Sequence, residues 1–166
     1  MSLSLNIERL PVADIPADVK VFLFENLYGP WGVDADDDWL GAEFAGEFLI
    51  LRADDGTLIG TARLMPSDKG QPTHPTPPEC AGERRLRQVA IVPKRRGQGI
   101  GTYLMRTAEG LLIEQGASRA GLAARNLAYD FYLSCGYSFV GEEFISPLTH
   151  IPHTHMSKVL SAPERS

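Results

Sequence analysis

The sequence is poor in cysteine, with only Cys80 and Cys135 among its 166 residues, too few for a disulfide-stabilised secreted framework. It contains no apolar run near the ~20 residues that a membrane-spanning helix needs. Its N-terminus lacks the basic segment followed by an apolar run that is typical of a signal peptide. It also lacks an excess of positive charge, because the formal net charge is −5, which argues against a general nucleic-acid binder. We therefore expect a cytoplasmic protein that binds neither a membrane nor a nucleic acid.

What the sequence has is the composition of an ordinary globular domain, with 43% hydrophobic and 22% charged residues. Its length predicts a single domain over 1–166, with a frayed tail at 161–166. The proline-rich segment 66–82 predicts an irregular loop, whereas Asp55-Gly56 predicts a tight hairpin. Strands and helices alternate in the second half, so we expect a mixed α/β sheet. The predicted strands are 3–10, 48–53, 57–65, 86–92, 119–123, 137–142 and 151–159, and the predicted helices run from Pro16 to a break at Gly29, over 34–44, from Gly101 to Gly116 and over 127–135.

The most informative segment runs from Ala90 to Gly101. The β-branched residues around Ala90 predict a buried strand, which Pro93 stops. Six of the sixteen Lys and Arg residues lie within 84–96, and a long amphipathic helical pattern follows the loop. A strand, a glycine loop and a helix start present backbone N–H groups and a positive helix end to an anion such as a pyrophosphate. The alternative is a glycine-rich turn with solvated arginines. The loop residues concerned are Arg95, Arg96, Gly97, Gly99 and Gly101.

Spacing separates this loop from two phosphate-binding motifs. The P-loop pattern Gly-x-x-x-x-Gly-Lys-Ser/Thr does not occur, and the dinucleotide fingerprint would need Gly or Ala where Thr102 stands. The pattern that remains is Arg96-x-x-Gly99-x-Gly101, which resembles the coenzyme A loop of the GNAT superfamily of N-acetyltransferases. Because Gly99 and Gly101 lack Cβ atoms, they would let the loop approach the phosphates closely.

A second motif resembles the same superfamily. Phe131-Tyr132 and Gly136-Tyr137 fill the pattern Phe-Tyr-x-x-x-Gly-Phe/Tyr that ends a helix in its members, and Ala128 falls at a matching small-residue position. The resemblance implies that Tyr132 sits beside the thioester sulfur and protonates the leaving thiolate. The alternative is an aromatic residue on a packed helix face.

The segments 141–144 and 151–156 resemble the closing strands of the small bacterial acetyltransferases called ElaA-like, so the resemblance covers roughly residues 45–160. It implies an α/β (α+β) fold with a mixed, mostly antiparallel central sheet of about seven strands and helices on both faces. Within the single domain, it implies that 84–143 form the acetyl-CoA-binding core and that 1–45 lie on the acceptor side.

The resemblance implies that acetyl-CoA is the cosubstrate and that its acetyl group passes to a primary amine by direct attack in a ternary complex, with a small molecule as the expected acceptor. A protein or peptide acceptor and a non-catalytic acyl-CoA-binding module on the same fold are the alternatives. A homodimer is compatible with the sequence. The cofactor-binding residues that the resemblance implies are Val89, Ala90, Ile91, Arg96, Gly97, Gln98, Gly99, Ile100, Gly101, Thr102, Arg125, Asn126 and Tyr132.

The amine must lose a proton, because an alkylammonium has a reference pKa near ~10.4. Many relatives carry a glutamate on the strand before the glycine loop, but this chain has Arg87 and Gln88 there, and its nearest carboxylate is Glu83. His153 and His155 share one strand face, and we expect no metal site because this pair has no further ligand at a suitable spacing. The catalytic candidates are Tyr132, His153 and Glu83, with Glu142 as a further carboxylate.

Two further observations concern the cofactor and the acceptor. Many relatives carry an asparagine seven residues before the tyrosine, where this chain has Arg125, with Asn126 one step later. Both residues are therefore candidates for contact with the cofactor. An acidic cluster near the N-terminus either attracts a cationic amine or forms a solvated loop and helix start. Its members are Asp34, Asp36, Asp37 and Asp38.

Overall fold

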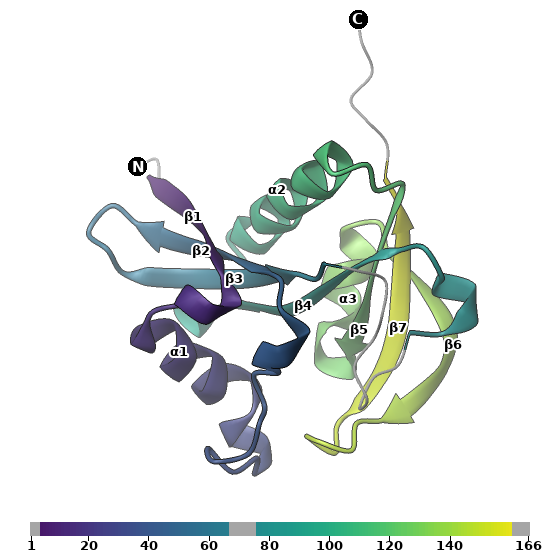
Figure 1. Ribbon diagram of the computed structural model, residues 1–166, viewed down its shortest axis with the longest axis horizontal. Helices are drawn as coiled ribbons and strands as arrows, with labels where there is room; N and C mark the ends of the chain where they lie inside the picture. Colours follow the sequence, from purple (N-terminus) through teal and green to yellow (C-terminus); the bar gives the residue numbers. More distant parts are fainter. Residues whose placement is uncertain (1–3, 67–75, 161–166) are drawn as a thin grey trace, which may run out of the picture.

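A computed structural model describes residues 4–66 and 76–160 of the chain (Figure 1). Seven strands form one sheet in the order β1-β2-β3-β4-β5-β7-β6. Adjacent described strands pair antiparallel except β4 with β5, which are parallel. The mixed, mostly antiparallel sheet that the sequence predicts is therefore confirmed. The strands are β1 Leu5–Pro11, β2 Glu47–Ala53, β3 Leu58–Leu64, β4 Arg84–Ile91, β5 Arg119–Arg125, β6 Ser138–Ile145 and β7 Pro152–Val159.

Helices cover both faces of this sheet because its central strands are apolar on both sides. In β2, Phe48 and Ile50 pack in the cluster formed with α1 (Ala17–Leu27). Leu49, which points to the other face, packs in the cluster formed with α2 (Ile100–Glu114). Figure 1 shows α1 and α2 on opposite sides of the β1–β4 half. The third helix, α3 (Tyr129–Ser134), follows β5 and packs in the same cluster as α2.

The predicted helix over 34–44 is wrong. The chain instead forms turns that end in a short 3-10 helix at Ala42–Phe44. The carboxylates of Asp34 and Asp38 accept hydrogen bonds from the backbone N–H groups of Asp36 (2.9 Å) and Gly41 (3.0 Å). These local bonds compete with helix formation, and Gly41 adopts a left-handed φ of 64°. Most of the predicted loop at 66–82 and the tail at 161–166 lie outside the described residues.

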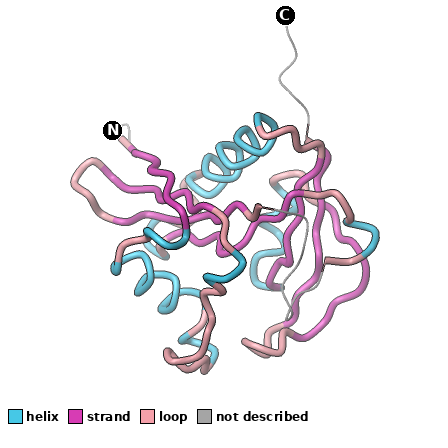
Figure 2. Tube along the Cα trace, in the orientation of Figure 1, coloured by secondary structure: helices cyan, strands magenta, loops and turns pink. Residues whose placement is uncertain are grey.

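The sheet opens between β4 and β5, and this opening is the feature that positions the site. The two strands pair only at Arg84↔Ala120 and Arg85↔Gly121. On the other side of β4, the register with β3 shifts by one residue at a bulge where Gln88 has a left-handed φ of 49°. The bulge bends β4 away from β5. Figure 2 shows that the strands of the two halves of the sheet run in different directions.

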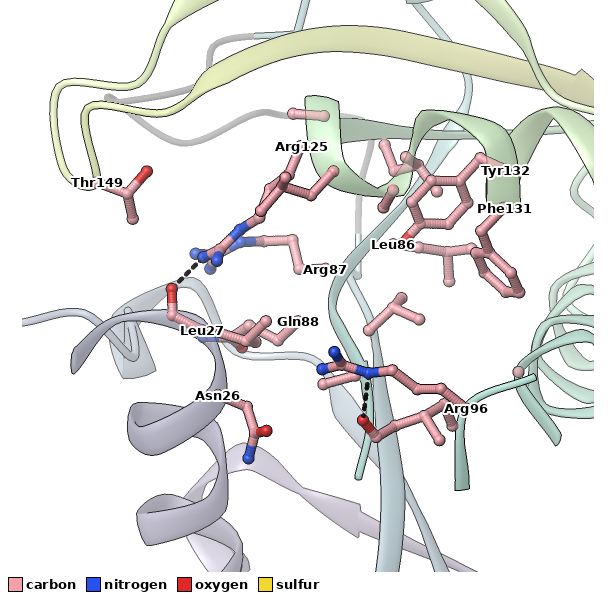
Figure 3. Close-up of a pocket in the computed structure, with 18 of the residues that line it drawn as sticks. Asn26, Leu27, Leu86, Arg87, Gln88, Arg96, Arg125, Phe131, Tyr132 and Thr149 are labelled. Carbon is pink, nitrogen blue, oxygen red and sulfur yellow. Dashed lines mark hydrogen bonds between the residues drawn. The ribbon is translucent and has the colours of Figure 1, made fainter. Parts of the chain in front are cut away.

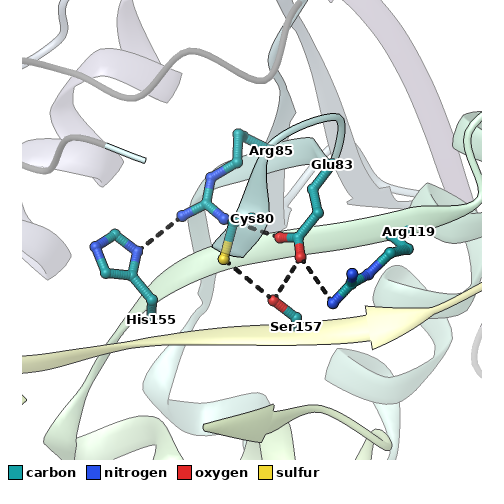
Figure 4. Close-up of polar contacts among 6 residues, drawn as sticks. All are labelled: Cys80, Glu83, Arg85, Arg119, His155 and Ser157. Atoms are coloured by element: carbon teal, nitrogen blue, oxygen red, sulfur yellow. Dashed lines mark hydrogen bonds and ion pairs between the residues drawn. The ribbon is translucent and has the colours of Figure 1, made fainter. Parts of the chain in front are cut away.

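A buried polar network braces the end where β4 and β5 still meet (Figure 4). Glu83, which is 0% exposed, lies 3.3 Å from both Arg85 and Arg119 and accepts a hydrogen bond from Ser157 at 2.8 Å. Arg85 also donates to Nδ1 of His155 at 3.0 Å. The network therefore joins β4, β5 and β7 through side chains, next to the last backbone pair between β4 and β5.

The position of His155 makes the stability of the fold dependent on pH. Burial, with the charges of Arg85 and His153, lowers the pKa of His155 to about 4. The unfolded chain binds this proton near pH ~6.5, so stability present above that pH is lost as the pH falls toward 4. We expect a loss on the order of 3 kcal/mol over this interval from His155 alone. Urea unfolding of the wild type and His155→Gln at several pH values measures the difference, and parallel stability curves would contradict the assignment.

Candidate active site

A cavity of about 630 Å³ fills the opening between β4 and β5 (Figure 3). Its walls come from the end of α1, from β4, from the glycine loop before α2, from the start of α3 and from the loop before β7. Cavities of this volume are typical of sites for small organic ligands. The interruption of the β4–β5 ladder thus creates the room for a ligand within the sheet itself.

The glycine loop forms one end of the cavity. Gly97 and Gly99 have φ values of 79° and 78°, which L side chains rarely adopt, and both line the cavity. Their conformation lets the chain turn sharply into α2, whose first backbone N–H groups lack intrahelical partners. Arg96 is held at this end by a hydrogen bond of 3.2 Å from Nε to the carbonyl oxygen of Ile91. Backbone N–H groups, a helix N-terminus and a guanidinium together favour an anion here.

The structure shows a packing reason for glycine at position 101. A Cβ atom at this position would lie 2.8 Å from the ring of Phe131 on α3. The missing side chain therefore allows α2 and α3 to pack closely. This packing places α3, and with it Tyr132, beside the start of α2.

The other predicted cofactor residues divide between the cavity and its surroundings. Those that line it are Val89, Ala90, Ile91, Arg96, Gly97, Gly99, Gly101, Thr102, Arg125 and Tyr132. Ile100 instead packs in the core with Leu51 and Ile59. Gln98 donates to the carbonyl oxygen of Lys94 at 3.4 Å, and Asn126 is exposed outside the lining. Of the two candidates near the missing asparagine, the structure thus brings only Arg125 to the cavity.

Tyr132 is 7% exposed and lines the cavity from α3. Burial raises the pKa of its phenol, so the hydroxyl stays protonated at neutral pH. The rings of Phe131 and Tyr137 meet it edge-on at centroid distances of 5.1 Å and 5.9 Å and fix its orientation. No hydrogen bond joins this hydroxyl to another residue of the described part of the chain. Its proton is therefore available to a ligand.

Neither predicted base, Glu83 or His153, lines the cavity. Glu83 is buried in the brace, where Arg85, Arg119 and Ser157 contact its carboxylate. His153 is buried in β7 and donates from Nδ1 to the carbonyl oxygen of Ile151 at 2.9 Å. Burial lowers its pKa. Glu142, the further carboxylate candidate for the base, is exposed on β6.

The structure adds residues that the sequence prediction missed, because they come from segments far apart in the chain. Tyr28 and Trp31 follow α1, and Thr149 precedes β7. Arg125 on β5 contacts the end of α1 and the segment that follows it, since it donates to the carbonyl oxygen of Leu27 and lies 4.8 Å from the ring centroid of Trp31. Arg87, which the sequence shows only as the residue in place of a glutamate, also lines the cavity.

The profile of the Acetyltransferase (GNAT) family matches residues 17–137, which include α1, β2–β5, the glycine loop, α2 and α3. The chain belongs to the GNAT family. The resemblance to this superfamily is thereby confirmed. Streptothricin acetyltransferase of Streptomyces lavendulae is 28% identical to it over 134 residues, which are 77% of this chain and 62% of that protein. The chain thus spans about three-fifths of that relative.

Solved structures share the fold of this GNAT protein at low sequence identity. Escherichia coli ElaA matches with a TM-score of 0.67 at 18% identity and covers 92% of this chain and 99% of its own. An acyl-CoA N-acyltransferase from Pseudomonas aeruginosa matches with a TM-score of 0.64 at 23% identity and covers 94% of this chain and 100% of its own. Across 4–66 and 76–160, no helix is long and apolar enough to cross a membrane, and no group of three His, Cys, Asp or Glu residues could hold a metal.

Proposed function

We propose that this GNAT protein transfers an acetyl group from acetyl-CoA to a primary amine of a small molecule, by direct attack in a ternary complex. The observation that carries the proposal is the opening between β4 and β5, with an anion-binding loop at one end and the protonated Tyr132 inside. The family profile and the names of the relatives support the choice of an acyl-CoA as the donor.

The residues at the opening fit such a donor. Backbone N–H groups from Gly97 to Thr102 and the guanidinium of Arg96 would hold the pyrophosphate. Beyond Arg85, β4 has no backbone pairing with β5, so its edge from Val89 to Ile91 faces the cavity. That edge offers hydrogen bonds to the amide groups of the pantetheine arm, as a neighbouring strand would. A backbone N–H near Ile91 would stabilise the negative charge that develops on the thioester oxygen.

In the proposed transfer, the amine nitrogen forms a bond to the thioester carbonyl carbon and the carbon–sulfur bond breaks. Tyr132 donates its proton to the leaving thiolate. The described lining of the cavity contains no Asp, Glu or His side chain, so we assign the amine proton to water rather than to a protein base. This assignment replaces Glu83 and His153 as the expected bases.

A small acceptor is favoured over a peptide because the cavity is bridged on its acceptor side. Arg125 on β5 reaches across to the carbonyl oxygen of Leu27 and lies against the rings of Trp31 and Tyr28, which follow α1. These contacts turn the end of the opening into a chamber, whereas an extended peptide needs an open groove. In this proposal, the acceptor side includes residues of the N-terminal segment.

The loop assignment predicts a loss of coenzyme A affinity when the loop is altered. Arg96→Ala removes charge-assisted hydrogen bonds and should weaken binding about 10- to 100-fold. Gly99→Glu should weaken it further, because the new carboxylate repels phosphate and the φ of 78° strains any L side chain. Titration calorimetry with coenzyme A measures both. Arg106→Ala is the control, since Arg106 is exposed on α2 outside the cavity. Wild-type affinity in both loop variants would contradict the assignment.

Thiol release from acetyl-CoA in the presence of an amine panel then separates an enzyme from a non-catalytic acyl-CoA-binding module. The panel should contain streptothricin, the acceptor in the name of the relative, and short peptides. Amine-dependent thiol release supports the proposal. Tight coenzyme A binding without release for any amine would favour the binding module.

A further inference from the structure

The charged side chains that line the cavity are all of one sign. The lining includes arginines but no Asp, Glu, Lys or His from the described residues, although the chain carries a net charge of −5. Charge of one sign gathered in a hollow attracts ligands of the opposite sign. The arginines concerned are Arg85, Arg87, Arg96 and Arg125.

Two of these arginines already have an assigned partner or ligand. Arg85 pairs with Glu83, and Arg96 lies at the glycine loop, where the pyrophosphate is proposed to bind. Arg87 and Arg125 remain, and no ion pair joins either of them to a carboxylate of the described residues. Figure 3 shows both side chains reaching toward the Leu27 and Thr149 end of the cavity, with Tyr132 across from them and Arg96 away from that end.

The buried atoms at this end are hydrogen-bond donors that lack acceptors. Nη1 of Arg87 and Oγ1 of Thr149 are both buried without a hydrogen-bond partner among the described residues. A buried polar atom without a hydrogen-bond partner is costly, and such atoms in a cavity commonly serve a ligand. A ligand that brings negative oxygen atoms would satisfy both groups.

Deeper in the protein, a further guanidinium adds to the positive field. Arg63 is 0% exposed, and its partners are neutral oxygen atoms. They are the carbonyl groups of Leu40 (2.6 Å), Gly41 (2.9 Å) and Ala45 (3.0 Å) and the side-chain amide of Gln88 (3.1 Å). None of the aspartates of the acidic cluster lines the cavity, although the charge of Asp38 partly offsets the charges of Arg63 and Arg87.

We propose that the acceptor amine also carries an anionic group, a carboxylate or a phosphate, which Arg87 and Arg125 bind at the end of the cavity away from the glycine loop. The inference rests on the proposed acetyl transfer and names its substrate class. Guanidinium groups match the oxygen pairs of both anions. Binding the anion there would leave the amine pointing back toward Tyr132. The positive surroundings also favour the uncharged amine over the ammonium, which eases its deprotonation without a protein base.

Matched acceptor pairs test the proposal. Each pair shares one carbon skeleton, such as an amino acid and its amide, or an aminoalkyl phosphate and its amino alcohol. In the wild type, the anionic member should react with a kcat/KM at least tenfold above that of its neutral partner. This preference should fall to within about twofold in Arg87→Gln and stay unchanged in Arg106→Gln, which removes the same charge outside the cavity. Phosphate pairs and carboxylate pairs show which anion is preferred.

A binding measurement keeps this test separate from the test of acetyl transfer. N-acetylated amino acids and aminoalkyl phosphates, with and without coenzyme A, should raise the melting temperature of the wild type more than their neutral counterparts do. The effect should disappear in Arg87→Gln. That variant should remain folded, because burial already lowers the pKa of the Arg87 guanidinium and one of its nitrogen atoms has no hydrogen-bond partner.

Preferential stabilisation by the anionic compounds supports the site even if no acceptor is acetylated, an outcome that would count against the transfer alone. Equal responses within every pair, or no response to any compound, would overturn the anionic acceptor. So would an undiminished preference in Arg87→Gln. If the anionic acceptor is overturned in this way but neutral amines still cause thiol release, the proposed acetyl transfer remains supported.

Discussion

Replacing Tyr132 with phenylalanine is expected to lower the turnover of acetyl-CoA about 10²- to 10⁴-fold, the usual contribution of a positioned acid. The ring lies against Phe131 and Tyr137, so the variant keeps the packing and loses only the hydroxyl. Because burial keeps that hydroxyl protonated, we expect it to act as a proton donor to the thiolate and to contribute little to binding of the ground state. Steady-state kinetics and calorimetry with coenzyme A measure the two effects separately.

Tyr129→Phe is the matched control for this experiment. The hydroxyl of Tyr129 contacts Thr154 at 2.6 Å and donates to Glu143 at 3.0 Å, and the residue does not line the cavity. Its loss should leave turnover within a factor of a few. Normal turnover in Tyr132→Phe would remove Tyr132 as the acid. A parallel loss of turnover and of coenzyme A affinity would instead assign it a binding role.

The architecture could be predicted from the sequence because the relevant signals are local. Val89 to Val92 and the stripe from Leu104 to Leu112 show the periodicity of a buried strand and an amphipathic helix, and the loop between them has its glycines at fixed spacing. Gly116 has a φ of 87° just beyond α2, as expected for a residue that ends a helix. The helix predicted over 34–44 was wrong because aspartates in this segment close turns through hydrogen bonds from their side chains. The periodicity of apolar residues does not reveal such bonds.

The site was only partly predictable for the same reason. The glycine loop and Tyr132 lie on elements whose motifs are contiguous in the sequence. The opening between β4 and β5, in contrast, depends on a bulge at Gln88 and on where the ladder stops, and both follow from contacts between distant strands. A bulge also changes which face the residues before it present. The position of Glu83 in the sequence therefore did not indicate its surroundings. Tyr28 and Thr149, which line the cavity, had no local signal.

The surroundings of Glu83 predict that its replacement lowers the stability of the fold. If Glu83 were the base, the same replacement would instead lower catalysis. Glu83→Gln leaves the buried guanidinium of Arg85 without its carboxylate, and breaking such a pair typically costs about 3–5 kcal/mol. The site has no room to rearrange, because a Cβ atom at Gly121 on β5 would already clash with Glu83 and Arg85. Urea unfolding at pH 7 measures the loss. Glu142→Gln, at an exposed position on β6, should stay within about 0.5 kcal/mol of the wild type.

The stability and the turnover of the same variant together show whether Glu83 braces β4 against β5 or acts as a catalytic base. A base contributes to the transition state, so its removal would lower kcat in a protein of normal stability. A brace contributes to the position of β4 against β5, so its removal should lower the free energy of unfolding. Turnover per folded molecule, measured well below the melting temperature, should then fall far less than in Tyr132→Phe. A normally stable Glu83→Gln protein with a large loss of kcat would contradict the brace. The expected pattern would show that Glu83, the carboxylate nearest to positions 87 and 88 in sequence, holds the cavity open and takes no part in the chemistry within it.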